Sequence, residues 1–112
     1  MSIPLPGTPV RGSKTGKPIM ALLDLLGRTW ALGIVWNLNK GGCTFRELQT
    51  RCEDISPTVL NARLKELVAT GFVIKTRLGY ELTELGSELF VHIEPLGLWS
   101  YQWRDMLNKE AN

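Results

Sequence analysis

The sequence predicts a mainly α-helical fold with one small β-hairpin, an α+β class, and three observations support this prediction. First, apolar residues recur with the 3.6-residue period of a helix in several segments before Gly71. Second, the period changes to 2 over a short stretch directly after Gly71. Third, the helical period returns from residue 84 and continues to the end of the chain.

Length and composition indicate one folded domain. The chain has 112 residues, of which 44% are hydrophobic and 21% are charged, as in an ordinary globule. Its apolar stretches are too short for a membrane span, and its N-terminus lacks a signal pattern. Cys43 and Cys52 stand alone, outside any metal or redox spacing, so we expect a reduced, cytoplasmic compartment.

Charge is distributed unevenly along the chain. Residues 1–77 carry 11 Lys and Arg against 5 Asp and Glu, a balance of +6. Residues 78–112 carry 2 Lys and Arg against 6 Asp and Glu, a balance of −4. Such an asymmetry indicates that the first part of the chain faces a polyanion.

The first elements are an arm and two helices. Residues 1–17 contain several Pro and Gly, three cations and no acid, which predicts a flexible basic arm. Residues 12–17 are similar to the phosphate-binding loop motif, but the spacing between their two glycines is one residue short. No strand precedes them either, so we expect no nucleotide cofactor. Pro18–Leu26 predicts a helix that ends at Gly27. We expect Thr29 to cap a buried second helix, Trp30–Leu38.

The next two helices have strong start signals. Thr44 and Glu47 form a capping box, and the helix that they begin runs to about Cys52. Ser56 and Pro57 then begin a helix that ends at Gly71. Two helices joined by so short a turn predict a helix-turn-helix.

The second of these helices has two different sides. Leu60, Leu64 and Leu67 share one side and predict its buried face. Its outer face is polar or short-chained and carries one cation and no acid: Thr58, Asn61, Ala62, Lys65 and Ala69. For a single helix, a solvated face is the ordinary interpretation, and the edge of a DNA base pair is the alternative.

A hairpin and a long helix complete the chain. Residues 72–77 and 80–82 flank a tight turn at Leu78 and Gly79, and we expect Lys75 and Arg77 to share a strand face. A cationic hairpin in this place makes a winged helix-turn-helix.

The last helix carries more apolar surface than so small a domain can cover, which predicts a homodimer. Its residues repeat at alternating spacings of three and four: Leu89, His92, Leu96, Trp99, Trp103 and Met106. Pro95 predicts a kink in this helix, or a split into two helices, near Glu94.

The order of these elements resembles the HxlR-type winged-helix transcription regulators, relatives of the MarR group. Five segments between residues 18 and 90 carry the resemblance: Ala21–Trp30, Phe45–Leu48, Ile55–Leu67, Gly71–Val73 and Tyr80–Gly86. The resemblance implies a DNA-binding homodimer that is joined through its first and last helices. Two features depart from the family: Lys17 precedes Pro18 where many relatives have a sensing cysteine, and the wing is short.

The resemblance and the residues together predict one domain in three parts: the arm 1–17, a DNA-binding part 18–83 and a dimerisation helix 84–112. On this hypothesis Asn61 reads a base, beside Thr58, Ala62 and Lys65. We expect the remaining DNA contacts to go to phosphate, from Thr44, Arg46, Ser56, Lys75 and Arg77, and loosely from Arg11 and Lys14. We expect the dimer interface to contain Leu22, Leu89, His92, Leu96, Trp99, Trp103 and Met106.

Several residues have a structural interpretation that competes with a functional one. Arg63 is expected to form an internal ion pair rather than read a base. His92 is expected to fill the core or the dimer interface rather than act as a switch. Cys43 and Cys52 are expected to be inert, with a reversible disulfide as the alternative.

Two other classes of function remain as alternatives. A winged-helix scaffold would use the apolar last helix to bind a different protein, without specific DNA binding. An enzyme has little support, because one His and two Cys form no usual zinc set and no nucleophile–base pattern stands out. The operator sequence, the direction of regulation and any small-molecule effector stay open.

Overall fold

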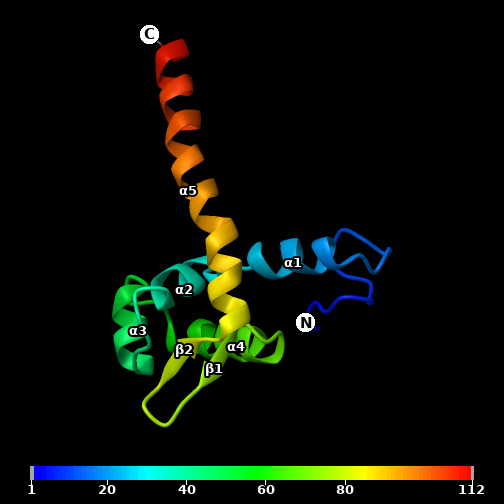
Figure 1. Ribbon diagram of the computed structural model, residues 1–112, viewed down its shortest axis with the longest axis vertical. Helices are drawn as coiled ribbons and strands as arrows, with labels where there is room; N and C mark the ends of the chain where they lie inside the picture. The colour runs from blue at the N-terminus through cyan, green and yellow to red at the C-terminus, as the bar shows by residue number, and fades with distance from the viewer. Residues whose placement is uncertain (1, 112) are drawn as a thin grey trace.

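The structure, a computed structural model, describes residues 2–111, and the side chains of these residues as far as Lys109. The described residues form five helices and two strands, in this order: α1 (Pro18–Leu26), α2 (Ala31–Leu38), α3 (Phe45–Arg51), α4 (Pro57–Ala69), β1 (Val73–Lys75), β2 (Tyr80–Leu82) and α5 (Glu84–Ala111). Figure 1 shows α2, α3, α4 and the hairpin grouped at one end of the molecule, and α5 extends away from them as one long helix. The winged helix-turn-helix fold is therefore confirmed.

The first two helices meet at an unexpected turn. α1 ends at Gly27, as predicted, where the Gly27 amide donates to the Leu23 carbonyl at 2.9 Å. Thr29 does not cap α2, because Trp30 occupies the N-cap position in a left-handed conformation with φ of 68°. The Trp30 indole packs over Gly33, where a Cβ would lie 2.8 Å from the ring. This contact holds Trp30 against the first turn of α2 and explains why the cap prediction was wrong.

The core forms where α2, α3, α4 and the base of α5 meet. Helix α2 buries four residues, so its predicted burial is confirmed: Ala31, Ile34, Val35 and Leu38. Leu48 of α3 and the three leucines of α4 complete the centre of this core. Burial of this apolar surface is the main force that holds the helices together.

Both predicted caps of the helix-turn-helix are present. The Thr44 hydroxyl accepts from the Glu47 amide at 3.1 Å, and the Glu47 carboxylate accepts from the Thr44 amide at 3.0 Å. At the start of α4 the Ser56 hydroxyl accepts from the Val59 amide at 3.3 Å. These caps fix where α3 and α4 begin, and therefore which side chains stand at their N-termini.

The hairpin turn lies one residue earlier than predicted. The Thr76 amide donates to the Gly79 carbonyl at 2.7 Å, so Arg77 and Leu78 are the central residues of the turn. Gly79 instead follows the turn with φ of 154°, against the Cys43 backbone, where a Cβ would lie 2.1 Å from the carbonyl oxygen. This close approach sets the register. Lys75, which pairs with Tyr80 in β2, therefore shares no strand face with Arg77.

The last helix continues past Pro95 without a break, so the alternative of two separate helices was wrong. Pro95 removes the hydrogen bond to the carbonyl of Val91. Both residues lie on the exposed surface of α5, where water can replace the missing donor. Nearby, Trp36 packs edge-on against Phe90 with ring centroids 5.1 Å apart, and this contact attaches the base of α5 to α2.

The base of α5 belongs to the core of the chain itself. Leu89 is only 8% exposed and lies beside the buried Phe90 and Ile93. Its assignment to a dimer interface was wrong, because the second strand and α2 bring the first turns of α5 onto the domain. Apart from Leu85 in the first turn, the large apolar residues that remain exposed on α5 lie between Val91 and Leu107.

Residues 2–17 have irregular structure but contact the rest of the domain. The Gly7 amide donates to the Gly16 carbonyl at 2.8 Å, and Pro4 is buried. Arg11, which we expected to contact phosphate loosely, instead lies with its Nε 3.5 Å from Asp24 Oδ1. The segment therefore folds back along α1 (Figure 1), and its flexibility stays a prediction.

Among the described residues, no single helix is long and apolar enough to cross a membrane. Only α1 and α2 taken together have the length and composition of a span, and they meet at an angle of 87°.

Replacing Gly79 by Ala tests the contact that sets the hairpin register. The new methyl group would meet the Cys43 carbonyl at a φ that L-residues avoid, so we expect a loss of about 2–4 kcal/mol in the free energy of unfolding. Gly41→Ala is the matched control, because Gly41 has φ of 125° and nothing within 4 Å of its Cβ position. Backbone strain alone should cost about 1 kcal/mol there. Equal losses for the two variants in urea unfolding would contradict the assigned contact.

Candidate nucleic-acid interface

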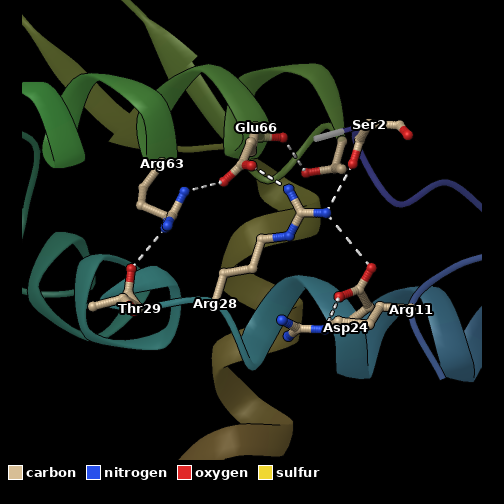
Figure 2. A network of polar contacts seen from close by, with 8 residues as sticks. Ser2, Arg11, Asp24, Arg28, Thr29, Arg63 and Glu66 are labelled. Atoms are coloured by element: carbon tan, nitrogen blue, oxygen red, sulfur yellow. Dashed lines mark hydrogen bonds and ion pairs between the residues drawn. The ribbon is translucent and has the colours of Figure 1, made fainter.

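The outer face of α4 is exposed. Leu60, Leu64 and Leu67 are buried, as their spacing predicts. All five residues of the outer face are exposed: Thr58, Asn61, Ala62, Lys65 and Ala69. The acid of this helix, Glu66, is buried at the flank of the outer face and points toward Arg28 and Arg63 (Figure 2). Helix α4 therefore presents a short-chained surface with hydrogen-bonding groups and one cation.

A hollow of about 300 Å³ separates α4 from the hairpin. It is lined by Asn61, Leu64, Lys65, Val68 and Ala69 of α4 and by Lys75 and Tyr80 of the hairpin. The Lys75 ammonium lies 6.0 Å from the centre of the Tyr80 ring, within the range of a cation–π interaction. The hollow thus brings two cations and a carboxamide together without an acid, an arrangement that suits an anionic ligand.

The helix N-termini differ in what they offer to a phosphate. Thr44 and Ser56 are exposed, and each hydroxyl accepts a cap hydrogen bond, which leaves its own O–H free to donate. At α3, however, the Thr44 backbone amide is already taken by the Glu47 carboxylate. The hydrogen bonds from Thr44 lower the pKa of Glu47, which keeps a negative charge at this helix end. The start of α4 carries no acid and is the more favourable phosphate site.

Two exposed arginines flank these groups. Arg46 lies in the first turn of α3, and Arg77 lies in the turn of the hairpin, beside the exposed Leu78. The hairpin turn projects from the body on the side away from α5 (Figure 1). The predicted DNA-contacting residues are thus brought to one end of the molecule, on α3, α4 and the hairpin.

Arg63 is an internal partner, as the sequence predicted. Its Nε donates to the Thr29 carbonyl at 2.8 Å, and its Nη1 donates to Glu66 Oε1 at 3.0 Å. Glu66 also pairs with Arg28, and Arg28 with Asp24 (Figure 2). The pair of Arg28 and Glu66 was not predicted from the sequence. One feature of the sequence indicated it: Glu66 lies beside the leucine stripe of α4, and a buried acid requires a cation as partner.

The exposed part of α5 carries the rest of the predicted dimer surface. Trp99 and Trp103 are 55% and 51% exposed, and Leu96 and Met106 are exposed beside them. His92 is also exposed, so it does not fill the core of the chain. Leu22 of α1 is half-buried and lines an apolar cavity of about 410 Å³ between α1 and the start of α5. The chain shown is a single protomer, and its dimerisation stays a prediction.

Both cysteines are free thiols within the core. Burial raises the pKa of Cys43 and, likewise, the pKa of Cys52, so both are neutral thiols at neutral pH. Within the described residues, no three His, Cys, Asp or Glu side chains gather as metal ligands would.

Comparison with known sequences identifies relatives that share this arrangement. The profile of the HxlR-like helix-turn-helix family matches residues 25–108. The HTH-type transcriptional regulator YvaP of Bacillus subtilis is 31% identical over 90 residues, which cover 74% of this chain and 83% of YvaP. The regulator YybR of the same organism is 30% identical over 106 residues, which cover 85% of this chain and 82% of YybR.

Solved structures give the same result. The quinone-bound YodB from B. subtilis matches with a TM-score of 0.71 and 31% identity, covering 75% of this chain and 96% of YodB. A possible HxlR family transcriptional factor from Thermoplasma volcanium matches with a TM-score of 0.64 and 28% identity, covering 79% of this chain and 82% of that chain.

The state of the two thiols can be tested with a thiol reagent. Because only the thiolate reacts, and because burial both shields these groups and raises their pKa, native protein at pH 7 should react slowly with a chromogenic disulfide. The rate should rise steeply once urea unfolds the chain. Rapid reaction of either thiol in the native protein would contradict the inert assignment.

Proposed function

The chain belongs to the HxlR-like helix-turn-helix family of transcriptional regulators, and we propose that it binds specific DNA sequences in the cytoplasm as a homodimer. In this proposal α4 lies in the major groove and the hairpin lies against the DNA backbone. The proposal rests on the exposed outer face of α4, which has no acid, and on the hollow beside it, which is lined by Lys65 and Lys75.

Base contacts are assigned to the outer face of α4. A carboxamide such as that of Asn61 can pair bidentately with adenine, and the methyl group of Ala62 can pack against thymine. Thr58 and Lys65 stand on the same face and add further hydrogen-bond donors. Short side chains on this face allow the helix backbone to approach the base edges closely.

Phosphate contacts are assigned to the groups around that face. Ser56 begins α4, Lys75 borders the hollow, and Arg77 stands in the hairpin turn. Arg46 and Thr44 on α3 lie at the start of the other helix of the motif. Such contacts fix the position of the protein on the duplex and make its affinity fall as salt rises.

Dimerisation is assigned to α5, together with Leu22 of α1. The exposed residues Leu96, Trp99, Trp103 and Met106 leave a long apolar face on a helix that projects from the domain. A second copy related by a two-fold axis would cover this face and place two copies of α4 on half-sites about one helical turn apart. The same face would also suit a different protein, which is the alternative of a winged-helix scaffold.

A small-molecule effector is included in the proposal, because the similar YodB structure is quinone-bound. The apolar cavity between α1 and α5, of about 410 Å³, is large enough for such a ligand.

Replacing Asn61 or Arg77 by Ala distinguishes base contacts from phosphate contacts. We expect Asn61→Ala to relax preference at one base position at a cost of about 1–3 kcal/mol. Arg77→Ala should weaken binding to all sequences alike. It should also reduce the slope of log affinity against log salt concentration by the equivalent of about one phosphate contact. Titration of an operator fragment and of a random duplex at several salt concentrations measures both effects. Equal weakening of both duplexes by both variants would contradict the base-reading role of Asn61.

Replacing Trp103 by Glu tests the dimer surface. A charge in the centre of the apolar face should weaken self-association by about 2 kcal/mol or more, and DNA affinity should fall with it. Leu98→Glu is the matched control, because Leu98 is exposed on α5 but lies off the stripe. Sedimentation velocity should show a monomer for the first variant and a dimer for the second. A monomeric wild-type protein that binds no DNA and instead captures a different protein would favour the scaffold.

A further inference from the structure

Arg28 stands where three parts of the chain meet (Figure 2). It lies in the turn after α1, and its side chain is only 4% exposed. Its Nη2 lies 3.5 Å from Asp24 Oδ2 of α1 and donates to the Ser2 carbonyl at 2.8 Å. Its Nη1 donates to Glu66 Oε2 of α4. One guanidinium therefore joins the N-terminal segment, α1 and α4.

A second connection runs beside the first. Glu66 Oε1 accepts from Arg63 Nη1 at 3.0 Å, and Arg63 Nε donates to the Thr29 carbonyl at 2.8 Å. Arg28 and Thr29 are neighbours in the α1–α2 turn, so both connections from α4 end on the same short segment. Helix α4 is thus held to this turn at two adjacent points through oriented polar contacts.

Oriented contacts define the rotation of α4 more tightly than the leucine core does. Apolar burial is non-directional, so Leu60, Leu64 and Leu67 set which face of α4 points outward but limit its exact rotation less closely. A planar guanidinium bonded to a carboxylate has a fixed geometry and resists such rotation. With side chains, a helix has a radius of about 5–6 Å, so a rotation of about 10° would move the tip of Asn61 by about 1 Å. That shift is enough to spoil a bidentate hydrogen bond.

The network is poorly arranged for stability alone. Within the described residues, the buried Arg28 Nε has no hydrogen-bond partner, and the buried Asp24 Oδ1 has no hydrogen bond and only an ion pair with Arg11 Nε at 3.5 Å. Unpartnered buried polar atoms are destabilising, and buried ion pairs often stabilise no more than apolar residues of similar size. The carboxylates of Asp24 and Glu66 face the guanidinium groups of Arg28 and Arg63, and the largely exposed Arg11 adds a third guanidinium beside Asp24. A purely stabilising role explains this arrangement less well than a geometric one.

We propose that Arg28 is a positioning residue, which acts through Glu66 to set the rotation of α4 and hence the register of Asn61 on a base pair. This inference rests on the proposed DNA-binding function. It adds a buried determinant of specificity at the flank of α4, outside the outer face that would contact DNA.

The test compares DNA discrimination with stability. The probes are a genomic fragment retained by the wild-type protein and a random duplex of the same length, and urea unfolding gives the stability. In the double variant Asp24→Asn, Arg28→Met, one buried charge of each sign is removed, and Glu66 keeps Arg63 as its ion-pair partner. We expect it to stay folded with near wild-type stability, while its preference for the genomic fragment over random DNA falls about tenfold.

A milder variant keeps the test decisive if the double variant does not fold. Arg28→Lys preserves the charge but lacks the fork that joins Asp24, Ser2 and Glu66, so the preference should fall while the protein remains folded. Arg104→Lys is the matched control, because Arg104 forms an exposed ion pair with Asp105 on α5. Its preference should equal that of the wild-type protein.

The two possible failures are distinguishable. A wild-type protein that binds genomic fragments and random DNA equally would overturn the proposed function, and the inference with it. A wild-type protein that discriminates, with folded Arg28 variants that discriminate equally well, would overturn the inference alone.

Discussion

The burial of Leu60, Leu64 and Leu67 determines which face of α4 points outward from the domain. These side chains are in the centre of the core, packed with residues of α2, α3 and β1. Because a helix turns by about 100° per residue, burying this stripe forces Asn61, Ala62 and Lys65 to the outside. The same contacts that fold the domain therefore select the face that it presents to a ligand.

Two further contacts complete the surface around that face. The paired backbone of Cys43 and Tyr80, with Gly79 packed against it, attaches the hairpin to the segment that begins α3. This attachment places Lys75 across a hollow from Lys65, so that cations from two elements face one space. The edge-on contact of Trp36 and Phe90 attaches the base of α5 to the domain, and most of the exposed apolar residues of α5 lie on the part that projects from it. The proposed DNA-contacting surface and the proposed dimer surface therefore lie in different parts of the molecule.

Short-range sequence patterns predicted the helices and the hairpin, whereas contacts between residues of different elements set the conformation of Trp30, the turn register and the buried ion pair. The caps at Thr44 and Ser56 and the faces of α4 follow from residues a few positions apart, so the sequence contained them. The conformation of Trp30 depends on its indole over Gly33, and the turn register depends on Gly79 against Cys43, which no local pattern reveals. The pair of Arg28 and Glu66 spans 38 residues and was missed for the same reason. Leu89 matched the apolar stripe equally well as core or interface, and only the packing of α5 separated the two.

If the outer face of α4 contacts base edges in a two-fold dimer, residue 61 of each protomer should lie against a base. A photo-cross-linking amino acid at position 61, with its adducts mapped on a genomic fragment that the protein retains, measures this contact directly. We expect adducts on bases at two positions related by a two-fold axis and about one helical turn apart. The absence of DNA adducts from position 61, in a complex that still forms on the fragment, would contradict it.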